Sequence, residues 1–516
     1  MKKIRIYFAL GLLFGLFACN SLLDVTPENS VTFENFYKTE KDMQAALDAM
    51  RSEFRATLAF DAYSRPVSVG YVCDTTKSIK EFNWDISQWG PQWVDFAWGG
   101  QYTLVSLTNI MLERIGGANI PEARKRFYIG QAHFYRAFVY FRIAQKWGEA
   151  PLKTNSMTIE KLGKVSNPEL LQFALNEINL ALPDIPERKD LTDVDGKPIT
   201  SKSMACRGVA QALKLEICLW KAALNNQPDL LDDAIRAANY VIDSCDYALA
   251  ANPEEVCTKV INGGTDEGIF EIKYNYIETG TNPWTTMRYF VTYPIKPEDE
   301  LGSVKNQEAQ VYQKTADKMF PGQFEGPIAD GHFIGDRRRL AYFYNLDTIR
   351  LNQEWAEKAA GFAYPYKFRK IQKGTDSYNE GRFECFASDH VFWRLADMIL
   401  LRAEAYARQG ETSKAIADLN RIRERAYGDD SGNYEASEGD LRYAIFKERE
   451  KELLWEGKRW WDVVRNNYWK TELWEFHRTK LTQADVDNGA LYMPVFLDAF
   501  SQNPLMSQNK YWQSRY

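Results

Sequence analysis

Apolar residues recur along most of the chain at the spacing of one helix face. Between residues 126 and 147 these positions are Phe127, Phe134, Phe138, Phe141 and Ile143. A period of three to four residues predicts an amphipathic helix. Gly148 follows directly and Pro151 comes three residues later, which is the residue pattern at which helices commonly end.

The same pattern predicts further helices in both halves of the chain. The segments are 203–224, 230–244, 441–455 and 459–466, and a pair within 394–425 that is divided at Gln409-Gly410-Glu411. We therefore expect a mainly α-helical fold.

The helix pair around Gly410 has a repeat-like spacing. Ala403, Tyr406, Gly410, Ala415 and Leu419 are separated by 3, 4, 5 and 4 positions, as in a tetratricopeptide helical hairpin. Residues 210–243 form a looser copy of this hairpin. Because a single repeat cannot bury its apolar face alone, several degenerate copies are expected.

Helical periodicity breaks down in two regions. Residues 256–387 contain short apolar pieces, such as the strand-like 268–276, punctuated by prolines. Residues 63–98 hold four tryptophans, namely Trp84, Trp89, Trp93 and Trp98. Long loops on a rigid scaffold usually carry function, so both regions are candidates for a binding face.

The first eighteen residues have the pattern of an export signal. Lys2, Lys3 and Arg5 precede an unbroken apolar run from residue 6 to residue 18. A helix over that run would be about 20 Å long, too short for a hydrocarbon core of about 30 Å. The run ends in Leu16-Phe17-Ala18-Cys19, which resembles a bacterial lipobox with Cys19 as the lipidated residue. The alternative is an ordinary signal peptide followed by a chance cysteine.

Composition narrows the class of function. The chain has 516 residues, a formal charge of −6 and 45% hydrophobic residues, which are globular values without the basic excess of nucleic-acid-binding proteins. Only 4 histidines are present, and there is no HExxH, P-loop or GxSxG motif. No cofactor, metal or catalytic residue is predicted. Aromatic residues reach 14%, which suits core packing or flat ligands.

Two charged motifs have a structural and a functional interpretation. Glu448 and Glu452 lie one helical turn apart in a charged helix that also contains Arg459. They could form an acid–base pair, but we favour a structural network bridged by arginines. Asp193-Val194-Asp195-Gly196 begins like a calcium loop, but Lys197 and Ala205 occupy positions that should carry ligands. A turn is expected there.

The cysteines give little evidence of a disulfide framework. Cys206 and Cys218 fall in an apolar helical stretch and are expected to be small buried residues. Cys245 and Cys257 could form a disulfide in an exported protein.

Several segments of the chain resemble segments of the SusD/RagB family of outer-membrane lipoproteins, and they occur in the order in which the family has them. Beyond the lipobox and Phe36-Tyr37-Lys38-Thr39-Glu40, they are Trp98, Tyr102 and Asn109, GQAHFYRAFVYFRIAQKWGEAPL (130–152), RLADMILLRAEAYARQG (394–410), AIFKEREKELLWEGKRWWDVVR (444–465) and YMPVFLDAFSQNPLMSQNKYW (492–512). Two closing tripeptides depart mildly from the family pattern: Pro494-Val495-Phe496 and Asn509-Lys510-Tyr511.

The resemblance implies a fold and a division of the chain. The fold would be about four tetratricopeptide-like hairpins supporting a loop-rich ligand face. After a signal peptide at 1–18, residues 19–516 would form a single SusD-like domain. Its helical repeats would lie mainly in 40–250 and 390–466, and its loop-rich region in 256–387.

The resemblance also implies a function and a partner. The chain would be a glycan-binding lipoprotein, held in the outer membrane by lipid and facing the cell exterior, that delivers glycan to a SusC-like TonB-dependent transporter. A RagB-like peptide-binding lipoprotein is the nearer alternative. An all-α polysaccharide-degrading enzyme is the more distant one.

The expected ligand face combines the two loop-rich regions. Its candidate residues are Asp74, Trp84, Trp89, Trp93 and Trp98, with Trp284, Tyr289 and Trp355 opposite. Aromatic rings would stack on the apolar faces of sugars, while a carboxylate would bond hydroxyl groups. Core packing is the competing interpretation for each ring, and Trp98 could belong either to the core or to the lining of the site. Tryptophans in amphipathic helices are assigned to the core: Trp147, Trp220, Trp393, Trp455, Trp460 and Trp461.

Overall fold

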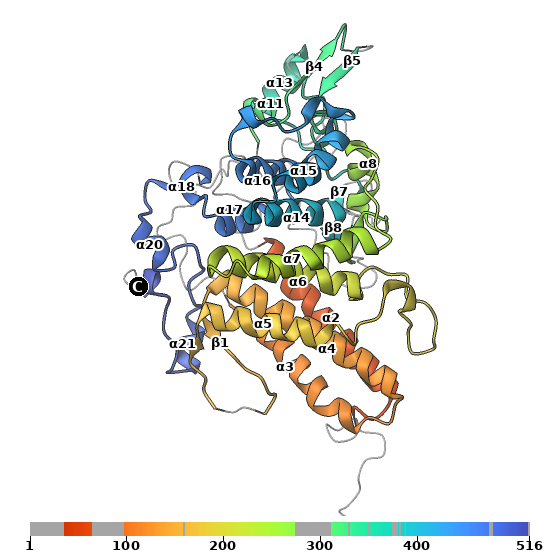
Figure 1. Cartoon of the computed structure of the whole chain (residues 1–516), viewed down its shortest axis with the longest axis vertical. Helices are drawn as coiled ribbons and strands as arrows, with labels where there is room; N and C mark the ends of the chain where they lie inside the picture. The colour runs from red at the N-terminus through yellow and green to blue at the C-terminus, as the bar shows by residue number, and fades with distance from the viewer. Residues whose placement is uncertain are drawn as a thin grey trace, which may run out of the picture.

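The computed structural model describes ten stretches of the chain: residues 36–63, 97–157, 160–273, 311–328, 331–348, 351–373, 380, 383–386, 389–473 and 478–513. These residues are mostly helical, as the periodicity predicts (Figure 1). Strands are short and occur as two-stranded sheets.

Four helix pairs form the body of the described structure. They are α2 (Glu40–Tyr63) with α3 (Gly99–Arg114), α4 (Glu122–Trp147) with α5 (Asn167–Ala181), α6 (Arg207–Leu224) with α7 (Leu230–Asn239), and α14 (Leu395–Gln409) with α15 (Thr412–Tyr427). Successive pairs contact one another through α3 and α4, α5 and α6, and α7 and α14, so the helices stack along the long axis (Figure 1). The expected scaffold of helical hairpins is confirmed.

Helix α4 is deeply buried in the stack. Phe134, Phe138 and Phe141 are almost wholly inaccessible to solvent, and Phe138 packs edge-on against Phe54 of α2. The helix ends at Gly148, whose φ of 74° lies in the region that favours glycine. The predicted helix and its stop signal are both confirmed.

The two repeat-like hairpins also form. Gly410 has a left-handed conformation, with φ 84°, and divides α14 from α15. Ala403 and Ala415 are completely buried, which lets the two helices approach closely. The looser copy is α6 and α7, and α7 continues into a π-helical turn, η4 (Tyr240–Ser244).

Further elements pack against the end of the stack that is formed by α14 and α15. Helix α16 (Leu441–Glu452) contacts both α14 and α15, and α17 (Arg459–Asn466) contacts α6. Strand β3 (Gly268–Ile272) pairs antiparallel with β8 (His390–Arg394), which leads directly into α14. The strand expected at 268–276 is therefore present in its first part. Helix α16 ends three residues before the predicted boundary, and Trp455 has a positive φ of 64°.

The remaining elements are short. Strands are β1 (Ala150–Pro151), β2 (Lys164–Val165), β4 (Gly322–Glu325), β5 (His332–Gly335), β6 (Ile371–Lys373) and β7 (Phe383–Phe386). Helices are α8 (Pro253–Thr258), α11 (Gln313–Met319), α12 (Arg338–Tyr342), α13 (Gln353–Ala359), α18 (Trp469–Glu472), α20 (Gln483–Asp487), α21 (Asp498–Gln502) and α22 (Lys510–Gln513). Single turns are η2 (Ile115–Gly117), η3 (Arg188–Asp190), η5 (Val260–Asn262), η8 (Asp430–Gly432) and η9 (Ala436–Glu438).

The tryptophans assigned to the core are all buried. They are Trp147, Trp220, Trp393, Trp455, Trp460 and Trp461. Several contact one another or neighbouring rings edge-on, as Trp220 does with Phe141 and Trp461. Such pairs add to the stabilisation from burial.

Candidate functional site

Most of the predicted ligand residues lie outside the described residues. This applies to Asp74, Trp84, Trp89, Trp93, Trp284 and Tyr289, and to the lipidation candidate Cys19. Trp355 lies in α13, but its side chain is not among those that the structure describes. These residues stay predictions, and only Trp98 can be placed.

Trp98 lies at the edge of the core. It directly precedes α3, and its half-buried ring packs edge-on against Tyr102 and Trp147, with centroid distances of 5.8 Å in both cases. These contacts fit the packing interpretation of Trp98, and its role as a ligand residue stays a prediction. Trp98 therefore holds the start of α3 against the end of α4.

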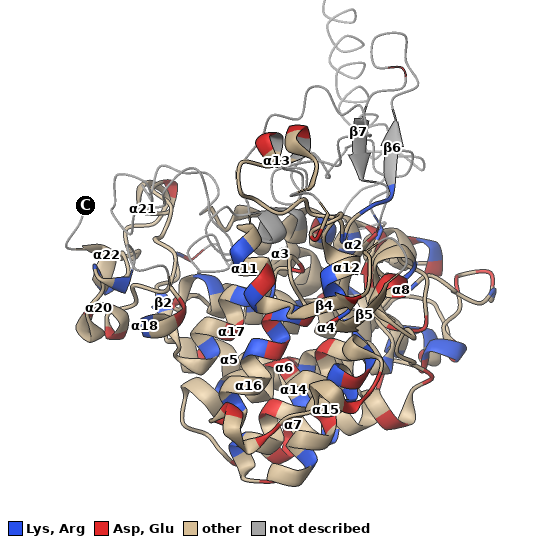
Figure 2. Ribbon diagram, turned by 90° about the horizontal axis from the view of Figure 1, so that it is seen from above, with Lys and Arg blue, Asp and Glu red and all other residues tan. Residues whose placement is uncertain are grey.

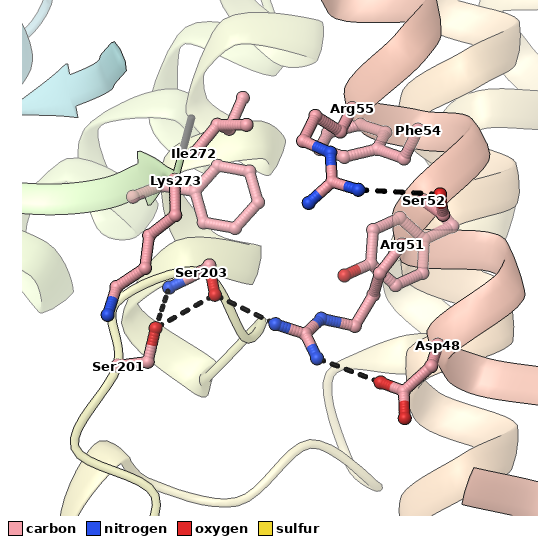
Figure 3. Close-up of a pocket in the computed structure, with 11 residues that line it drawn as sticks. Asp48, Arg51, Ser52, Phe54, Arg55, Ser201, Ser203, Ile272 and Lys273 are labelled. Atoms are coloured by element: carbon pink, nitrogen blue, oxygen red, sulfur yellow. Dashed lines mark hydrogen bonds and ion pairs between the residues drawn. The ribbon is translucent and has the colours of Figure 1, made fainter. Parts of the chain in front are cut away.

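A cavity of about 400 Å³ lies between four segments of the chain: α2, α4, the loop before α6 and the end of β3 (Figure 3). Helix α2 contributes Asp48, Arg51, Ser52 and Arg55, which share one helix face because they are spaced at one-turn intervals. The loop before α6 contributes Ser201 and Ser203, and the end of β3 contributes Ile272 and Lys273. The volume falls within the range of small-molecule sites, about 300–1,000 Å³.

Hydrogen bonds fix one cationic group at the cavity wall. Arg51 donates from Nη1 to Asp48 Oδ1 at 2.9 Å and from Nη2 to Ser203 Oγ at 2.8 Å. Ser203 is in turn 2.8 Å from the hydroxyl of Ser201. Figure 3 shows the guanidinium group of Arg51 reaching from α2 across to the loop. Arg51 therefore links the two walls and holds a positive charge in a defined position.

The inner part of the cavity is aromatic. Phe54, Tyr135 and Phe270 line it, and each is at most 3% exposed. Phe54 contacts Tyr135 edge-on at 5.0 Å between ring centroids and Phe270 at 5.8 Å. A cavity with an apolar interior and polar groups at its mouth is the usual build of a small-molecule site.

Sequence reasoning did not identify this cavity. The polar face of α2 has the pattern of an ordinary solvent-exposed helix face, and its partners come from residues 201–203 and 270–273. The sequence did contain one indication of the cavity. Arg51 and Arg55 lie one helical turn apart, beside the apolar Phe54, which the structure shows to be buried.

The charged helix is part of a buried ionic network and not of an open site. Arg338 lies 2.6 Å from Glu448 Oε1 and 3.2 Å from Glu452 Oε2, and all three side chains are at most 1% exposed. Figure 2 shows both basic and acidic segments on α14, α15 and α16, three of the helices that contribute residues to this network. Substrate cannot reach these carboxylates, so the structural interpretation is confirmed.

Electrostatics keep the network ionised. Burial alone would raise the pKa of the Glu452 carboxyl, but the charges of Arg425, Arg394 and Arg338 outweigh it and hold that pKa well below its usual range. For Glu448, burial is likewise outweighed, by Arg338, Lys451 and Arg423, and the pKa falls to about 2. An acid catalyst near neutral pH would need the opposite shift.

The calcium-like motif forms a turn. The carboxylate of Asp193 accepts hydrogen bonds from the backbone N–H groups of Asp195 and Lys197, both at 2.9 Å. This self-satisfied loop matches the predicted turn. Across the part of the chain that the structure describes, no group of three or more His, Cys, Asp or Glu side chains is arranged to hold a metal ion.

The suggested disulfide between Cys245 and Cys257 is absent, because both thiols are free. Cys257 lies buried in α8 and donates to the carbonyl of Ala341 at 3.5 Å. Cys245 follows η4 and lies against Gly208, and burial raises the pKa of its thiol to about 12. Cys206 and Cys218 are buried, as expected.

The stack of helical hairpins, with a cavity between α2 and β3, identifies the chain as a helical-repeat protein. A family model described as "SusD family" matches residues 339–512, and one described as "Starch-binding associating with outer membrane" matches residues 21–189. The chain belongs to the SusD/RagB family.

Relatives match the chain over nearly its whole length. SusD-like protein P38 of Formosa agariphila is 27% identical over 502 residues, which cover 90% of this chain and 92% of the relative. SusD-like protein P25 of the same organism is 22% identical, with 90% of each chain covered.

Solved structures share the fold. A SusD homologue from Bacteroides thetaiotaomicron superposes with a TM-score of 0.71 at 21% identity, covering 92% of this chain and 99% of the other. NanU of B. fragilis superposes with a TM-score of 0.68 at 19% identity, covering 94% and 99%. At these identities the likeness is one of fold.

Proposed function

We propose that the chain is a non-enzymatic glycan-binding lipoprotein that captures oligosaccharides or polysaccharides at the cell surface and delivers them to a SusC-like TonB-dependent transporter. The observation that carries this proposal is the match of residues 21–189 to the family model described as starch-binding and associating with the outer membrane. The matched segment includes Trp84, Trp89 and Trp93, as well as the cavity residues of α2.

Attachment to the membrane depends on Cys19 in this proposal. No helix among the described residues has the length and apolarity to span a bilayer. Lipid on Cys19, after removal of residues 1–18, would supply the anchor, and two or more acyl chains hold a protein stably. Residues 19–516 would then act as one domain outside the membrane.

The proposed ligand face starts at the walls of the described cavity. Helix α2 leads into residues 64–96, which carry three of the predicted tryptophans and Asp74, and Lys273 directly precedes residues 274–310, which carry Trp284 and Tyr289. Both predicted segments therefore directly follow elements that line the cavity, α2 and β3. This supports a ligand site that includes the cavity and its two flanking segments.

The direct test is a binding screen with the full chain purified in mild detergent. Retardation in gels that contain single polysaccharides should identify at least one glycan ligand, and mass spectrometry of that glycan after incubation should show no cleavage. Peptide pools are screened in parallel by calorimetry. Binding of peptides and of no polysaccharide would favour the RagB-like alternative, and cleavage of the glycan would favour the enzyme.

A further inference from the structure

The cavity carries an excess of positive charge. Three cationic side chains line it, namely Arg51, Arg55 and Lys273, against the single carboxylate of Asp48. Asp48 is already engaged by Arg51 at 2.9 Å. Glu53, the other nearby acid of α2, does not line the cavity, and its carboxylate lies beside Gly100 of α3. The excess stands out in a chain whose formal charge is −6.

Two of these cations have no carboxylate to neutralise them among the described residues. Arg55 makes one long contact, from Nη2 to Ser52 Oγ at 3.5 Å. Lys273 is solvent-exposed at the opposite wall, in the position that Figure 3 shows across from α2. By contrast, the buried Arg338 is paired with three acids, Asp336, Glu448 and Glu452. An anion entering the cavity would therefore meet unneutralised donors.

The buried Tyr135 hydroxyl of the cavity lies close to the guanidinium of Arg51 but is not well satisfied. The Tyr135 hydroxyl is inaccessible to solvent and makes no hydrogen bond of good geometry, although the residue lines the cavity. An unsatisfied buried polar group costs about 1–3 kcal/mol, so such groups commonly mark a missing ligand or water. Burial raises the pKa of Tyr135 to about 12, against the opposing charge of Arg51, so the hydroxyl stays protonated and able to donate.

The lining suits a saccharide better than a small inorganic anion. About 400 Å³ is more than a phosphate or sulfate ion fills, and the interior presents Phe54, Phe270 and Ile272. Apolar C–H faces of a sugar ring can pack on such a wall, while serine hydroxyls at the mouth bond ring hydroxyls. Guanidinium groups bind carboxylate and sulfate oxygens with paired hydrogen bonds.

We infer that this cavity binds the anionic group of an acidic saccharide, a carboxylate or a sulfate ester, with Arg55 and Lys273 as its direct partners and Arg51 as a fixed positive charge behind them. This inference rests on the proposed glycan-binding function and names the substrate class. A neutral sugar could hydrogen-bond these groups but would leave the charges of Arg55 and Lys273 without a counter-charge.

The experiment compares ligands that differ only in charge. Oligogalacturonate is titrated into the full chain in mild detergent, alongside its fully methyl-esterified form, and κ-carrageenan oligosaccharide alongside its desulfated form. We expect one acidic member to bind at least tenfold more tightly than its neutral counterpart, and which pair discriminates identifies the anion as carboxylate or sulfate. A neutral glycan that binds while every acidic one fails would overturn the inference and leave the proposed function intact.

Variants then locate the anion. Arg55→Gln and Lys273→Gln should each weaken binding of the acidic ligand at least tenfold, and Tyr135→Phe should weaken it severalfold. Arg236→Gln is the matched control, because that guanidinium lies on α7 with its side chain 68% exposed and does not line the cavity. Thermal unfolding followed by circular dichroism confirms that each variant is folded.

The outcomes distinguish a failure of the acidic-saccharide inference from a failure of the proposed glycan-binding function. Wild-type affinity in both the Arg55 and Lys273 variants would place the anion elsewhere and overturn the inference, whereas glycan binding as such would stand. Binding of acidic peptides and of no saccharide would overturn the inference and the proposed function together.

Discussion

Arg394 Nη1 and Glu452 Oε1 lie 2.7 Å apart, and each side chain is 1% exposed. Arg394 ends β8 and directly precedes α14, whereas Glu452 is the last residue of α16. Arg394 also bonds Glu267 and Glu456, and Glu452 also bonds Arg425. The pair therefore joins the β3–β8 sheet to the helical stack from inside the core.

Removing Glu452 should destabilise the protein strongly. Glu452→Ala leaves Arg394 and Arg425 short of a buried negative charge, and breaking a buried ion pair by removing one partner costs about 3–5 kcal/mol. Chemical denaturation of the variant should show this loss in the free energy of unfolding. Glu122→Ala is the control, because that carboxylate is 76% exposed and its nearest cation is 4.0 Å away; its effect should stay within about 0.5 kcal/mol. Equal losses in the two variants would contradict the structural role of the network.

Acid should unfold the protein through the same network. Glu448 has a pKa of about 2 in the folded chain against an ordinary value of 4.5. A folded pKa below the unfolded one gives stability that is present above the unfolded pKa and is lost as pH falls through the folded pKa. The free energy of unfolding should therefore drop between pH of about 4.5 and 2, as urea titrations at a series of pH values would measure. Glu448→Gln should reduce the slope in this window, and an unchanged slope would exclude Glu448 as a source of the pH dependence.

The sequence predicts the charged helix better than it predicts its partners. The one-turn spacing of Glu448 and Glu452 correctly indicates that arginines can bridge them, and Arg338 does so. Arg338 and Arg394 are, however, 114 and 58 positions away from Glu452, and such pairings depend on tertiary packing. Arg459, which we expected in the same charged helix, instead begins α17 and bonds Glu450 and Glu472.

The same limit applies to the cavity. Periodicity and stop signals predict helix positions because these depend on neighbouring residues, as at Gly148 and Gly410. The cavity requires α2, α4, the loop at Ser201 and the end of β3 to meet, and no local sequence pattern encodes that arrangement. The family resemblance directs attention to the two loop-rich regions of the sequence and does not single out Arg55 or Lys273.

The end of α4 should tolerate only glycine well. Gly148 has a φ of 74°, and a Cβ atom there would lie 3.0 Å from the ring of Tyr492. Gly148→Ala should cost about 1–2 kcal/mol from the backbone alone, plus the displacement of Tyr492, as measured by thermal unfolding. Gly116→Ala is the control, because a Cβ there meets nothing within 4 Å. A Gly148 variant as stable as the Gly116 variant would argue against this account of the helix end.

Loss of the lipidated cysteine should release the protein. If Cys19 carries the lipid, Cys19→Ala should move from the membrane fraction to the soluble fraction, since the described residues include no membrane-spanning helix. Cell fractionation followed by immunoblotting measures the distribution. Cys73→Ala should remain with the membrane. Retention of the Cys19 variant in salt-washed outer membranes would refute the lipobox interpretation.

The aromatic residues before α3 should divide into a packing residue and ligand residues. Trp98→Ala should lower the melting temperature, because it removes a ring that packs on Trp147 and Tyr102. In contrast, alanine at one or more of Trp84, Trp89, Trp93 and Trp284 should weaken glycan binding at least tenfold and leave the helical circular dichroism unchanged. Truncating a central aromatic anchor typically costs about 2 kcal/mol, or about 30-fold in affinity.

Gel retardation with the glycan found in the screen measures affinity, and circular dichroism melts measure stability on the same samples. Stacking loses little conformational entropy, since tryptophan has only two side-chain torsions, so a ligand-contacting ring should affect binding more than folding. A Trp98 variant with normal stability and lost binding would reverse its assignment to the core. Normal binding in all four other variants would place the ligand elsewhere on the loop-rich face, with Tyr289 and Trp355 as the next residues to replace.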